Sequence, residues 1–188
     1  MTEPKKNLSD LSIDQSWTLL LDRDGVINEK IDNGYVCNWK QFQFRDGALE
    51  MLKVLSSLVR ITVIVTNQRC IGRGLITEND LSGIHDKMKL EVGKSGGKID
   101  SIYHCPHIIE DNCNCRKPQT GLALQAKADF PQINFQKSLL IGDSISDMEF
   151  AKRLNMTTVL ITNQFPVTNN NLIDYHFSDL HILTRNIT

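Results

Sequence analysis

Four short apolar runs, each followed directly by polar residues, constrain the fold of this chain more than any other feature. The runs cover residues 17–21, 61–65, 138–141 and 157–161. Continuous leucine and β-branched runs of this length are expected of parallel strands that are covered on both faces. Helical patterns lie between and after them, at residues 48–58, 77–92, 121–129 and 146–154. Alternating strands and helices predict an α/β fold with a doubly wound parallel sheet.

Length and charge restrict the domain organisation and the partners. The 188 residues suit one domain, which we assign to residues 17–188, after a polar N-terminal extension over residues 1–16 that we expect to be partly disordered. A net charge of −1 predicts no nucleic-acid partner. The extension lacks the apolar core of a signal peptide, and no apolar run could span a bilayer. We therefore expect a cytoplasmic protein, and a monomer because no exposed apolar stripe is evident.

Two carboxylates follow the first run, in Asp22-Arg23-Asp24-Gly25. Ligands bind at the carboxyl ends of the strands in such sheets, so both side chains are candidates for one site. Asp22 is placed to attack phosphorus, and Asp24 to act as a general acid and then as a base. The simpler interpretation is an ordinary Asp-Gly turn after a strand, which the partners elsewhere in the chain make less favourable.

Two further motifs supply groups that hold a phosphoryl group. Thr66-Asn67-Gln68 follows the second run, where a hydroxyl and backbone N–H groups can bind phosphate oxygens. Arg116-Lys117 is an adjacent pair of cations: Lys117 can neutralise the phosphoryl group, and Arg116 can form a fork onto a substrate oxygen. Taken alone, the first motif would be a polar turn and the second a solvated basic pair.

A metal site is indicated after the third run, at Gly142-Asp143. Asp143 can complete a shell of oxygen ligands for Mg²⁺ together with Asp22 and Asp24. Asp147 could orient that shell, or could cap the helix that follows.

Four soft ligands lie within eleven residues, in Cys105-Pro106-His107 and Cys113-Asn114-Cys115. Three thiolates and one imidazole are typical of a closed structural zinc site, so we predict Zn²⁺ in the loop 105–115. His104 is the competitor for the position of His107. Cys37 and Cys70 lie outside the cluster and are interpreted as ordinary thiols, in keeping with a reducing compartment.

These motifs, in this order, resemble those of the haloacid-dehalogenase superfamily of phosphohydrolases, from about residue 17 to residue 161. The resemblance implies a Rossmann-like sheet and a Mg²⁺-dependent phosphomonoesterase with an aspartyl-phosphate intermediate on Asp22. It implies that Asp24 is the general acid and base, that Thr66 and Lys117 stabilise the phosphoryl group, and that Mg²⁺ is held by Asp22, the backbone carbonyl of Asp24, and Asp143. Residues 23–65 are too few for a large cap domain.

The zinc loop that leads into Cys115-Arg116-Lys117 resembles one branch of that superfamily, which contains heptose 1,7-bisphosphate phosphatases and histidinol-phosphate phosphatases. The resemblance to the heptose enzymes implies removal of the 7-phosphate of a small phosphorylated sugar. It assigns substrate contacts to two loops and one arginine: Asp32, Asn33, Gly34, Tyr35, Asn67, Gln68, Arg69 and Arg116.

Three departures from the heptose pattern leave the substrate open. The zinc loop is short and resembles the histidinol-phosphate branch, Arg69-Cys70 stands where Ser-Gly is usual, and Ser144 replaces a common lysine. The alternatives are a histidinol-phosphate phosphatase, a phosphatase of another small metabolite and, more remotely, a polynucleotide 3′-phosphatase. From another class, a zinc-containing binding module without catalysis is disfavoured by the intact set of Asp22, Asp24, Lys117 and Asp143.

Overall fold

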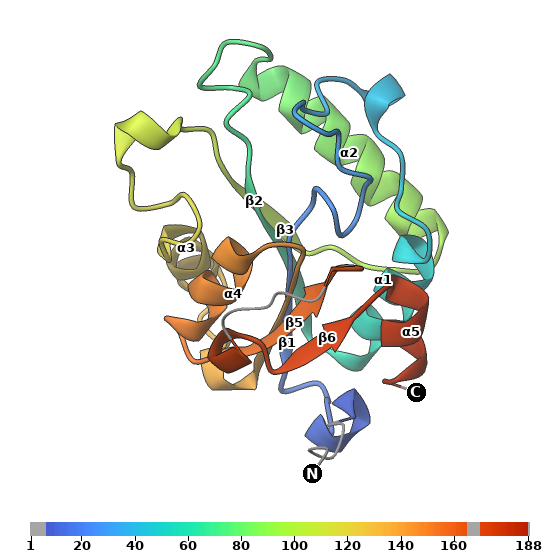
Figure 1. Cartoon of the computed structure of the whole chain (residues 1–188). Coiled ribbons are helices and arrows are strands. Elements are labelled where there is room, and N and C mark those ends of the chain that lie inside the picture. Colours follow the sequence, from blue (N-terminus) through green and yellow to red (C-terminus); the bar gives the residue numbers. More distant parts are fainter. Residues whose placement is uncertain (1–6, 165–169, 188) are drawn as a thin grey trace.

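A single six-stranded parallel sheet forms the centre of the computed structural model, which describes residues 7–164 and 170–187 (Figure 1). The strands are β1 (Thr18–Leu21), β2 (Ile61–Asn67), β3 (Ser101–Cys105), β4 (Ser138–Gly142), β5 (Thr157–Ile161) and β6 (Tyr175–Phe177). Their order is β3-β2-β1-β4-β5-β6, and every neighbouring pair is parallel. The predicted doubly wound α/β sheet is therefore confirmed.

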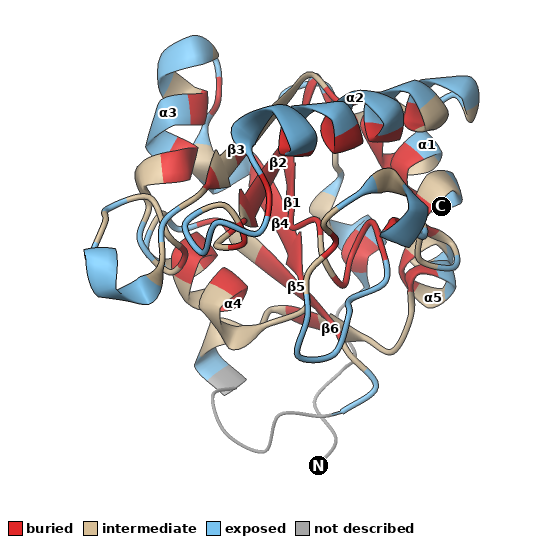
Figure 2. Ribbon diagram, turned by 90° about the horizontal axis from the view of Figure 1, so that it is seen from above, coloured by how far each residue is buried: buried red, intermediate tan, exposed pale blue. Residues whose placement is uncertain are grey.

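Helices cover both faces of the sheet (Figure 2). The α-helices are α1 (Ala48–Leu58), α2 (Glu78–Lys94), α3 (Gly121–Asp129), α4 (Ile145–Lys152) and α5 (Leu180–Arg185). Helix α1 packs against α2 and α5 on one face, whereas α3 contacts β2 and β3 and α4 contacts β4 and β5 on the other. The short 3-10 helices are η1 (Leu8–Leu11), η2 (Trp39–Gln41), η3 (Ile109–Asp111), η4 (Phe135–Lys137) and η5 (Asn170–Leu172). No helix of the described residues is both long and apolar enough to cross a membrane.

Strand β1 divides the core because its side chains alternate between the two faces. Leu19 and Leu21 join the core beneath α1, α2 and α5, and Leu20 joins the core beneath α3 and α4. All three are fully buried. A strand of this kind needs apolar residues at every position, which is why its sequence is a continuous run.

Two of the strands and one α-helix were not predicted from the sequence. Strand β3 lies at one edge of the sheet and only part of it is buried, so its sequence mixes polar and apolar residues instead of forming a run. Strand β6 lies at the other edge and has three residues. Helix α5 has six residues, too few for a helical pattern to emerge.

The N-terminal segment differs in part from the expected extension. Leu8 is fully buried in the core beneath α1, and the N–H of Ser9 donates to the carbonyl of Asn186 at 3.1 Å. Residues 7–16 are therefore packed against the rest of the chain, because burial of Leu8 holds them there. Residues 1–6 lie outside the described residues, and the single domain over residues 17–188 stays a prediction.

The direction in which the sheet is built reverses at β1. The chain adds β2 and β3 on one side of β1 and then β4, β5 and β6 on the other. The carboxyl ends of β1 and β4 are thus neighbours, and the N–H of Asp22 donates to the carbonyl of Ile141 at 3.0 Å. Such a switch point is where ligands bind in open α/β sheets.

Candidate active site

A cavity of about 590 Å³ opens at this switch point, at the carboxyl ends of the strands. Its size is in the range of pockets that hold small metabolites. Acidic side chains lie close to the strand ends, and five cations contribute to the walls. The lining residues that carry charge are Asp22, Asp24, Asp143, Asp147, Lys30, Arg69, Arg73, Arg116 and Lys117.

Lys117 joins two carboxylates in the floor of the cavity. Its Nζ lies 2.9 Å from a carboxylate oxygen of Asp22 and 2.6 Å from one of Asp147. The lysine comes from the segment before α3, whereas Asp22 follows β1 and Asp147 lies in α4. Burial acts to lower the pKa of Lys117, but the two carboxylates outweigh it and hold that pKa above its ordinary value. Lys117 is therefore a permanent cation beside Asp22.

The Asp22 side chain is 12% exposed, and this burial has an electrostatic consequence. Burial raises the pKa of Asp22 to about 7, and repulsion from Asp147 and Asp143 acts in the same direction, against the attraction of Lys117. A cation bound at this point would favour the ionised carboxylate. The site is thus arranged to attract positive charge.

Three carboxylates converge where a cation could bind. One oxygen each of Asp22, Asp143 and Asp147 lies within 4.8 Å of the others. Carboxylate oxygens are hard ligands that fit Mg²⁺, which usually takes one or two of them and completes its shell with water and phosphate oxygens. Asp143 also forms an ion pair with Lys30, in which Oδ2 lies 2.8 Å from Nζ.

Asp147 has the capping function that the sequence left open. Its Oδ2 accepts hydrogen bonds from the N–H of Ser144 at 3.2 Å and from the Ser144 hydroxyl at 2.5 Å, in a capping box at the start of α4. Its other oxygen faces Lys117. The residue therefore fixes both the helix and the lysine.

Gly25 lets Asp143 approach β1. The backbone of Gly25 has a φ of +92°, and a Cβ added there would lie 2.2 Å from Asp143 Oδ2. A side chain at this position would be strained and would displace the carboxylate. The glycine of the Asp22-to-Gly25 motif is thus required by a contact that only the folded chain makes.

The Asp24 side chain lines the cavity and is held by three partners. Arg23 donates to both of its oxygens at 2.8 and 3.1 Å, Asn28 donates at 2.9 Å, and Gln68 donates at 2.7 Å. Burial acts to raise the pKa of Asp24, but the Arg23 guanidinium and these hydrogen bonds outweigh it and hold the pKa below its ordinary value. The contacts therefore favour the carboxylate form.

Arg23 is fully buried and is the largest such side chain among the described residues. Its remaining amino group lies 3.2 Å from Nε2 of His85, in α2. Burial, with Arg23 beside it, lowers the pKa of His85 to about 3, so the imidazole is neutral and accepts the hydrogen bond. Neither Arg23 nor His85 was predicted as part of the site, because their contact joins residues far apart in sequence.

The polar residues at the end of β2, Thr66 to Gln68, face partly into the cavity and partly into the interior. Thr66 lines the cavity, and its hydroxyl accepts a hydrogen bond from Gln68 at 2.9 Å. Gln68 is 2% exposed and does not line the cavity, because its amide is occupied by Thr66 and Asp24. The amide of Asn67 pairs with the backbone of Lys117 at 3.0 and 3.2 Å. Asn67 also lines the cavity. The substrate contacts assigned to Asn67 and Gln68 stay predictions, and these hydrogen bonds show in addition that each residue holds a neighbour in place.

The first predicted substrate loop reaches the cavity in part. Asn33, Gly34 and Tyr35 line it, as does Arg69 from the loop after β2. Asp32 is exposed and is not among the lining residues, because the chain reverses in a turn there, where the N–H of Gly34 donates to the carbonyl of Ile31. Lys30 and Arg73 also line the cavity, although the sequence did not identify them as site residues.

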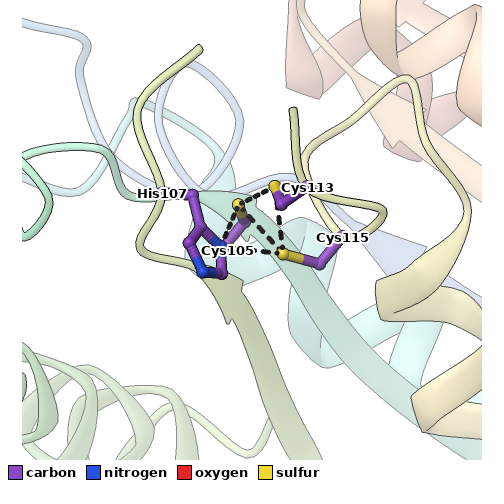
Figure 3. A group of neighbouring side chains, drawn as sticks. All are labelled: Cys105, His107, Cys113 and Cys115. Carbon is purple, nitrogen blue, oxygen red and sulfur yellow. Dashed lines mark hydrogen bonds between the residues drawn. The ribbon is translucent and has the colours of Figure 1, made fainter. Parts of the chain in front are cut away.

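A second group of ligands lies beside β3 (Figure 3). The thiols of Cys105, Cys113 and Cys115 and Nδ1 of His107 point toward one another, with contacts of 3.2 to 3.6 Å. Zinc bonds of about 2.3 Å to sulfur and 2.0–2.1 Å to nitrogen give tetrahedral edges of roughly 3.5–3.8 Å, so the group fits Zn²⁺. His104 instead contacts Glu78 at 2.8 Å, which removes it as the competing ligand.

Comparison with known proteins agrees with this fold. Residues 114–169 match the family model described as HAD-hydrolase-like. A crystal structure of D,D-heptose 1,7-bisphosphate phosphatase from B. bronchiseptica, complexed with magnesium and phosphate, superposes with a TM-score of 0.78 at 26% identity. The match covers 91% of this chain and 97% of that one. The fold and site define a haloacid-dehalogenase-like phosphoric monoester hydrolase.

Two relatives of similar sequence show which family within this class of hydrolases the chain belongs to. The chain is 41% identical over 135 residues to D-glycero-alpha-D-manno-heptose-1,7-bisphosphate 7-phosphatase of Mycobacterium tuberculosis, covering 72% of this chain and 71% of the relative. It is 38% identical over 157 residues to D-glycero-beta-D-manno-heptose-1,7-bisphosphate 7-phosphatase of Pasteurella multocida, covering 80% of this chain and 84% of that relative. The chain belongs to the family of D-glycero-D-manno-heptose-1,7-bisphosphate 7-phosphatases.

Proposed function

We propose that this chain is a Mg²⁺-dependent phosphatase that removes the phosphate on C7 of D-glycero-D-manno-heptose 1,7-bisphosphate. The observation that carries the proposal is the position of Asp22. It lies at the carboxyl end of β1, in the wall of the cavity, 2.9 Å from Lys117 and within the carboxylate cluster. The names of the curated relatives support the substrate.

In the proposed reaction, Asp22 attacks the phosphorus of the C7 phosphate in line with the departing sugar oxygen. Asp24, in its protonated form, gives a proton to that oxygen as the P–O bond to the sugar breaks, and an acyl phosphate forms on the Asp22 carboxylate. Asp24, now a carboxylate, then takes a proton from water, which attacks the phosphorus. The P–O bond to Asp22 breaks, inorganic phosphate leaves, and the Asp22 carboxylate and the protonated Asp24 are restored. The hydrogen bonds from Arg23, Asn28 and Gln68 stabilise the carboxylate form of Asp24 that this second step needs.

The charge of the transferred phosphoryl group is balanced by the walls of the cavity. Lys117 Nζ and the Thr66 hydroxyl are the donors that we assign to its equatorial oxygens. Bound Mg²⁺ would neutralise the phosphate oxygens and favour the ionised nucleophile. Asp22, Asp143 and the backbone carbonyl of Asp24 are the ligands that we propose for it, and Asp147 lies close enough to orient them.

The Cys105, His107, Cys113 and Cys115 group is proposed to hold a structural Zn²⁺. Residues 106–114 contain few buried side chains, so the loop depends on its ligands for a fixed shape. The last ligand, Cys115, directly precedes Arg116 and Lys117. Zinc in this loop would thus fix the position of two residues that line the cavity.

The experiment that tests the function is phosphate release in the presence of Mg²⁺. Native protein is given heptose 1,7-bisphosphate, as each anomer separately, and histidinol phosphate at matched concentrations. We expect kcat/KM to be highest for one of the heptose anomers. Higher kcat/KM for histidinol phosphate would contradict the substrate and leave the Asp22 chemistry standing, with the short zinc loop as the better guide.

Variants test the chemistry independently of the substrate. Asp22→Asn is expected to abolish turnover of both the heptose and a generic aryl phosphate, and Asp24→Asn to impair it severely without loss of bound Mg²⁺. Asp46→Asn is the matched control, because that side chain is 93% exposed and does not line the cavity. Turnover by Asp22→Asn close to the native rate would refute the nucleophile, and no hydrolysis of any phosphate ester by native protein would favour a binding module.

A further inference from the structure

We propose that Arg69, Arg73 and Tyr35 form a second anion site, which binds the phosphate of the substrate that is not cleaved. This inference rests on the proposed function and extends it: the ligand is a phosphate monoester dianion on C1 of the sugar whose C7 phosphate reacts. All three residues line the cavity that contains Asp22, so one bisphosphate molecule can contact both sites.

The two arginines share one aromatic ring. The guanidinium carbon of Arg69 lies 5.5 Å from the centroid of the Tyr35 ring, and that of Arg73 lies 5.7 Å from it. Arg69 Nε also donates to the Tyr35 hydroxyl. The ring thus holds two cations from the loop after β2 against the loop that follows β1. Cation–π contacts of this kind orient a guanidinium without consuming most of its N–H donors.

No carboxylate of residues 7–164 or 170–187 pairs with Arg69 or Arg73. The other cations of the cavity differ in this respect. Lys30 is paired with Asp143, and Lys117 with Asp22 and Asp147. Both lysines of the cavity are therefore engaged with the carboxylates, whereas the two arginines keep their positive charge available for a ligand.

Two like charges held against one ring repel each other, and the ring offsets only part of that repulsion. A phosphate dianion bound between the guanidinium groups would replace their mutual repulsion with attraction of both groups to the dianion. It would also accept several charge-assisted hydrogen bonds, for which planar guanidinium groups are well suited. Arg116 adds a further donor on the same cavity, since its Nη1 is buried and has no hydrogen-bond partner among the described residues.

The test compares heptose 1,7-bisphosphate with heptose 7-phosphate, which differ only in the phosphate assigned to this site. The native enzyme, Arg69→Gln and Arg73→Gln are compared by the ratio of kcat/KM for the two substrates. We expect the native enzyme to prefer the bisphosphate, and each variant to reduce that preference by about tenfold to a hundredfold, the loss typical of hydrogen bonds to a charged group. The loss should fall mainly on KM, because the contact is present before and during the reaction.

Arg60→Gln is the matched control. Arg60 is exposed, lies directly before β2 at the opposite end of the strand, and does not line the cavity. The control should keep the native preference for the bisphosphate. An unchanged ratio in both Arg69→Gln and Arg73→Gln, or equal losses on the two substrates, would overturn the second anion site.

A separate arm distinguishes failure of this inference from failure of the proposed function. If the native enzyme hydrolyses an aryl phosphate but neither heptose phosphate, the heptose assignment fails by itself. The anion site is then tested by competition: fructose 1,6-bisphosphate should inhibit hydrolysis of the aryl phosphate more strongly than fructose 6-phosphate does. That difference should disappear in the double variant Arg69→Gln, Arg73→Gln, and its persistence there would overturn the inference.

Discussion

Lys117 and Asp147 form an ion pair of 2.6 Å in which the two side chains are only 2% and 1% exposed. The pair connects the segment before α3 to the first turn of α4, and its lysine also reaches Asp22. Water cannot replace either partner at this depth. The position of Lys117 beside Asp22 therefore depends on Asp147, to which we assign no chemical step.

Asp147→Asn is expected to destabilise the protein by about 3–5 kcal/mol, since removing one partner leaves the other charge buried with weaker compensation. It should also lower kcat, because Lys117 loses one of the two groups that orient it. Chemical denaturation and steady-state kinetics measure the two effects. Glu91→Gln, which removes a carboxylate from an exposed pair with Lys94, should cost no more than about 1 kcal/mol. Equal costs for both variants would contradict the importance of the buried pair.

Gly25→Ala is expected to weaken Mg²⁺ binding more than tenfold, because the added methyl group would occupy the position of the Asp143 carboxylate. Calorimetric titration with Mg²⁺ measures the affinity, and a thermal melt shows whether the variant is folded. Gly83→Ala in α2 is the control, since a Cβ there meets no atom within 4 Å. Native Mg²⁺ affinity in Gly25→Ala would show that Asp143 is not a ligand or can move freely.

Removal of zinc is expected to lower the free energy of unfolding by about 3 kcal/mol or more, because the ligands bind the metal only when the loop is folded. The native protein should contain one Zn²⁺ per chain by elemental analysis. Cys113→Ser should lose the metal, whereas Cys37→Ser, outside the cluster, should retain it. A native protein without zinc, or one whose stability is unaffected by a chelator, would refute the zinc site.

His85 is expected to make the protein less stable in acid. Its pKa falls from 6.5 to about 3 on folding, so the unfolded chain binds a proton that the folded chain does not. Stability from this group is complete above pH 6.5 and is lost at about 1.4 kcal/mol per pH unit below it. The pKa of Asp22 shifts in the opposite direction, to about 7, so this group stabilises the folded protein as pH falls. The pH dependence of the unfolding free energy of the native protein therefore combines both groups.

Comparison with His85→Gln isolates the histidine. The difference in unfolding free energy between native protein and variant should shrink by about 1.4 kcal/mol per unit between pH 6 and pH 4. Urea denaturation at several pH values in that interval measures it. His181→Gln, at a side chain that is 52% exposed, should follow the native pH dependence. A constant difference across the interval would mean that His85 takes up a proton in the folded protein.

The central strands and the residues at their ends could be predicted because the signals are local. Strand β1 is buried on both faces, so its sequence is a continuous apolar run that ends at Asp22. The same holds for β4 and Asp143. The cluster of Cys105, His107, Cys113 and Cys115 could be predicted for the same reason, since three cysteines and a histidine within eleven residues form a short pattern that is typical of zinc sites.

The edges of the sheet and the direction of several side chains could not be predicted in this way. Strand β3 lies at an edge and is only partly buried, so its sequence contains no continuous run. Gln68 directly follows β2, but it turns inward, because Asp24 and Thr66 offer acceptors that no spacing in the sequence reveals.

The sequence by itself determined the class of fold, the candidate nucleophile Asp22 and the cluster of candidate zinc ligands, because each depends on a run of neighbouring residues. Only the tertiary structure decided which distant side chains would meet. The contacts of Arg23 with His85, of Lys117 with Asp147, and of the two arginines with Tyr35 each join separate elements. Such contacts arise from the packing of helices and loops around the sheet, and packing is a property of the whole chain.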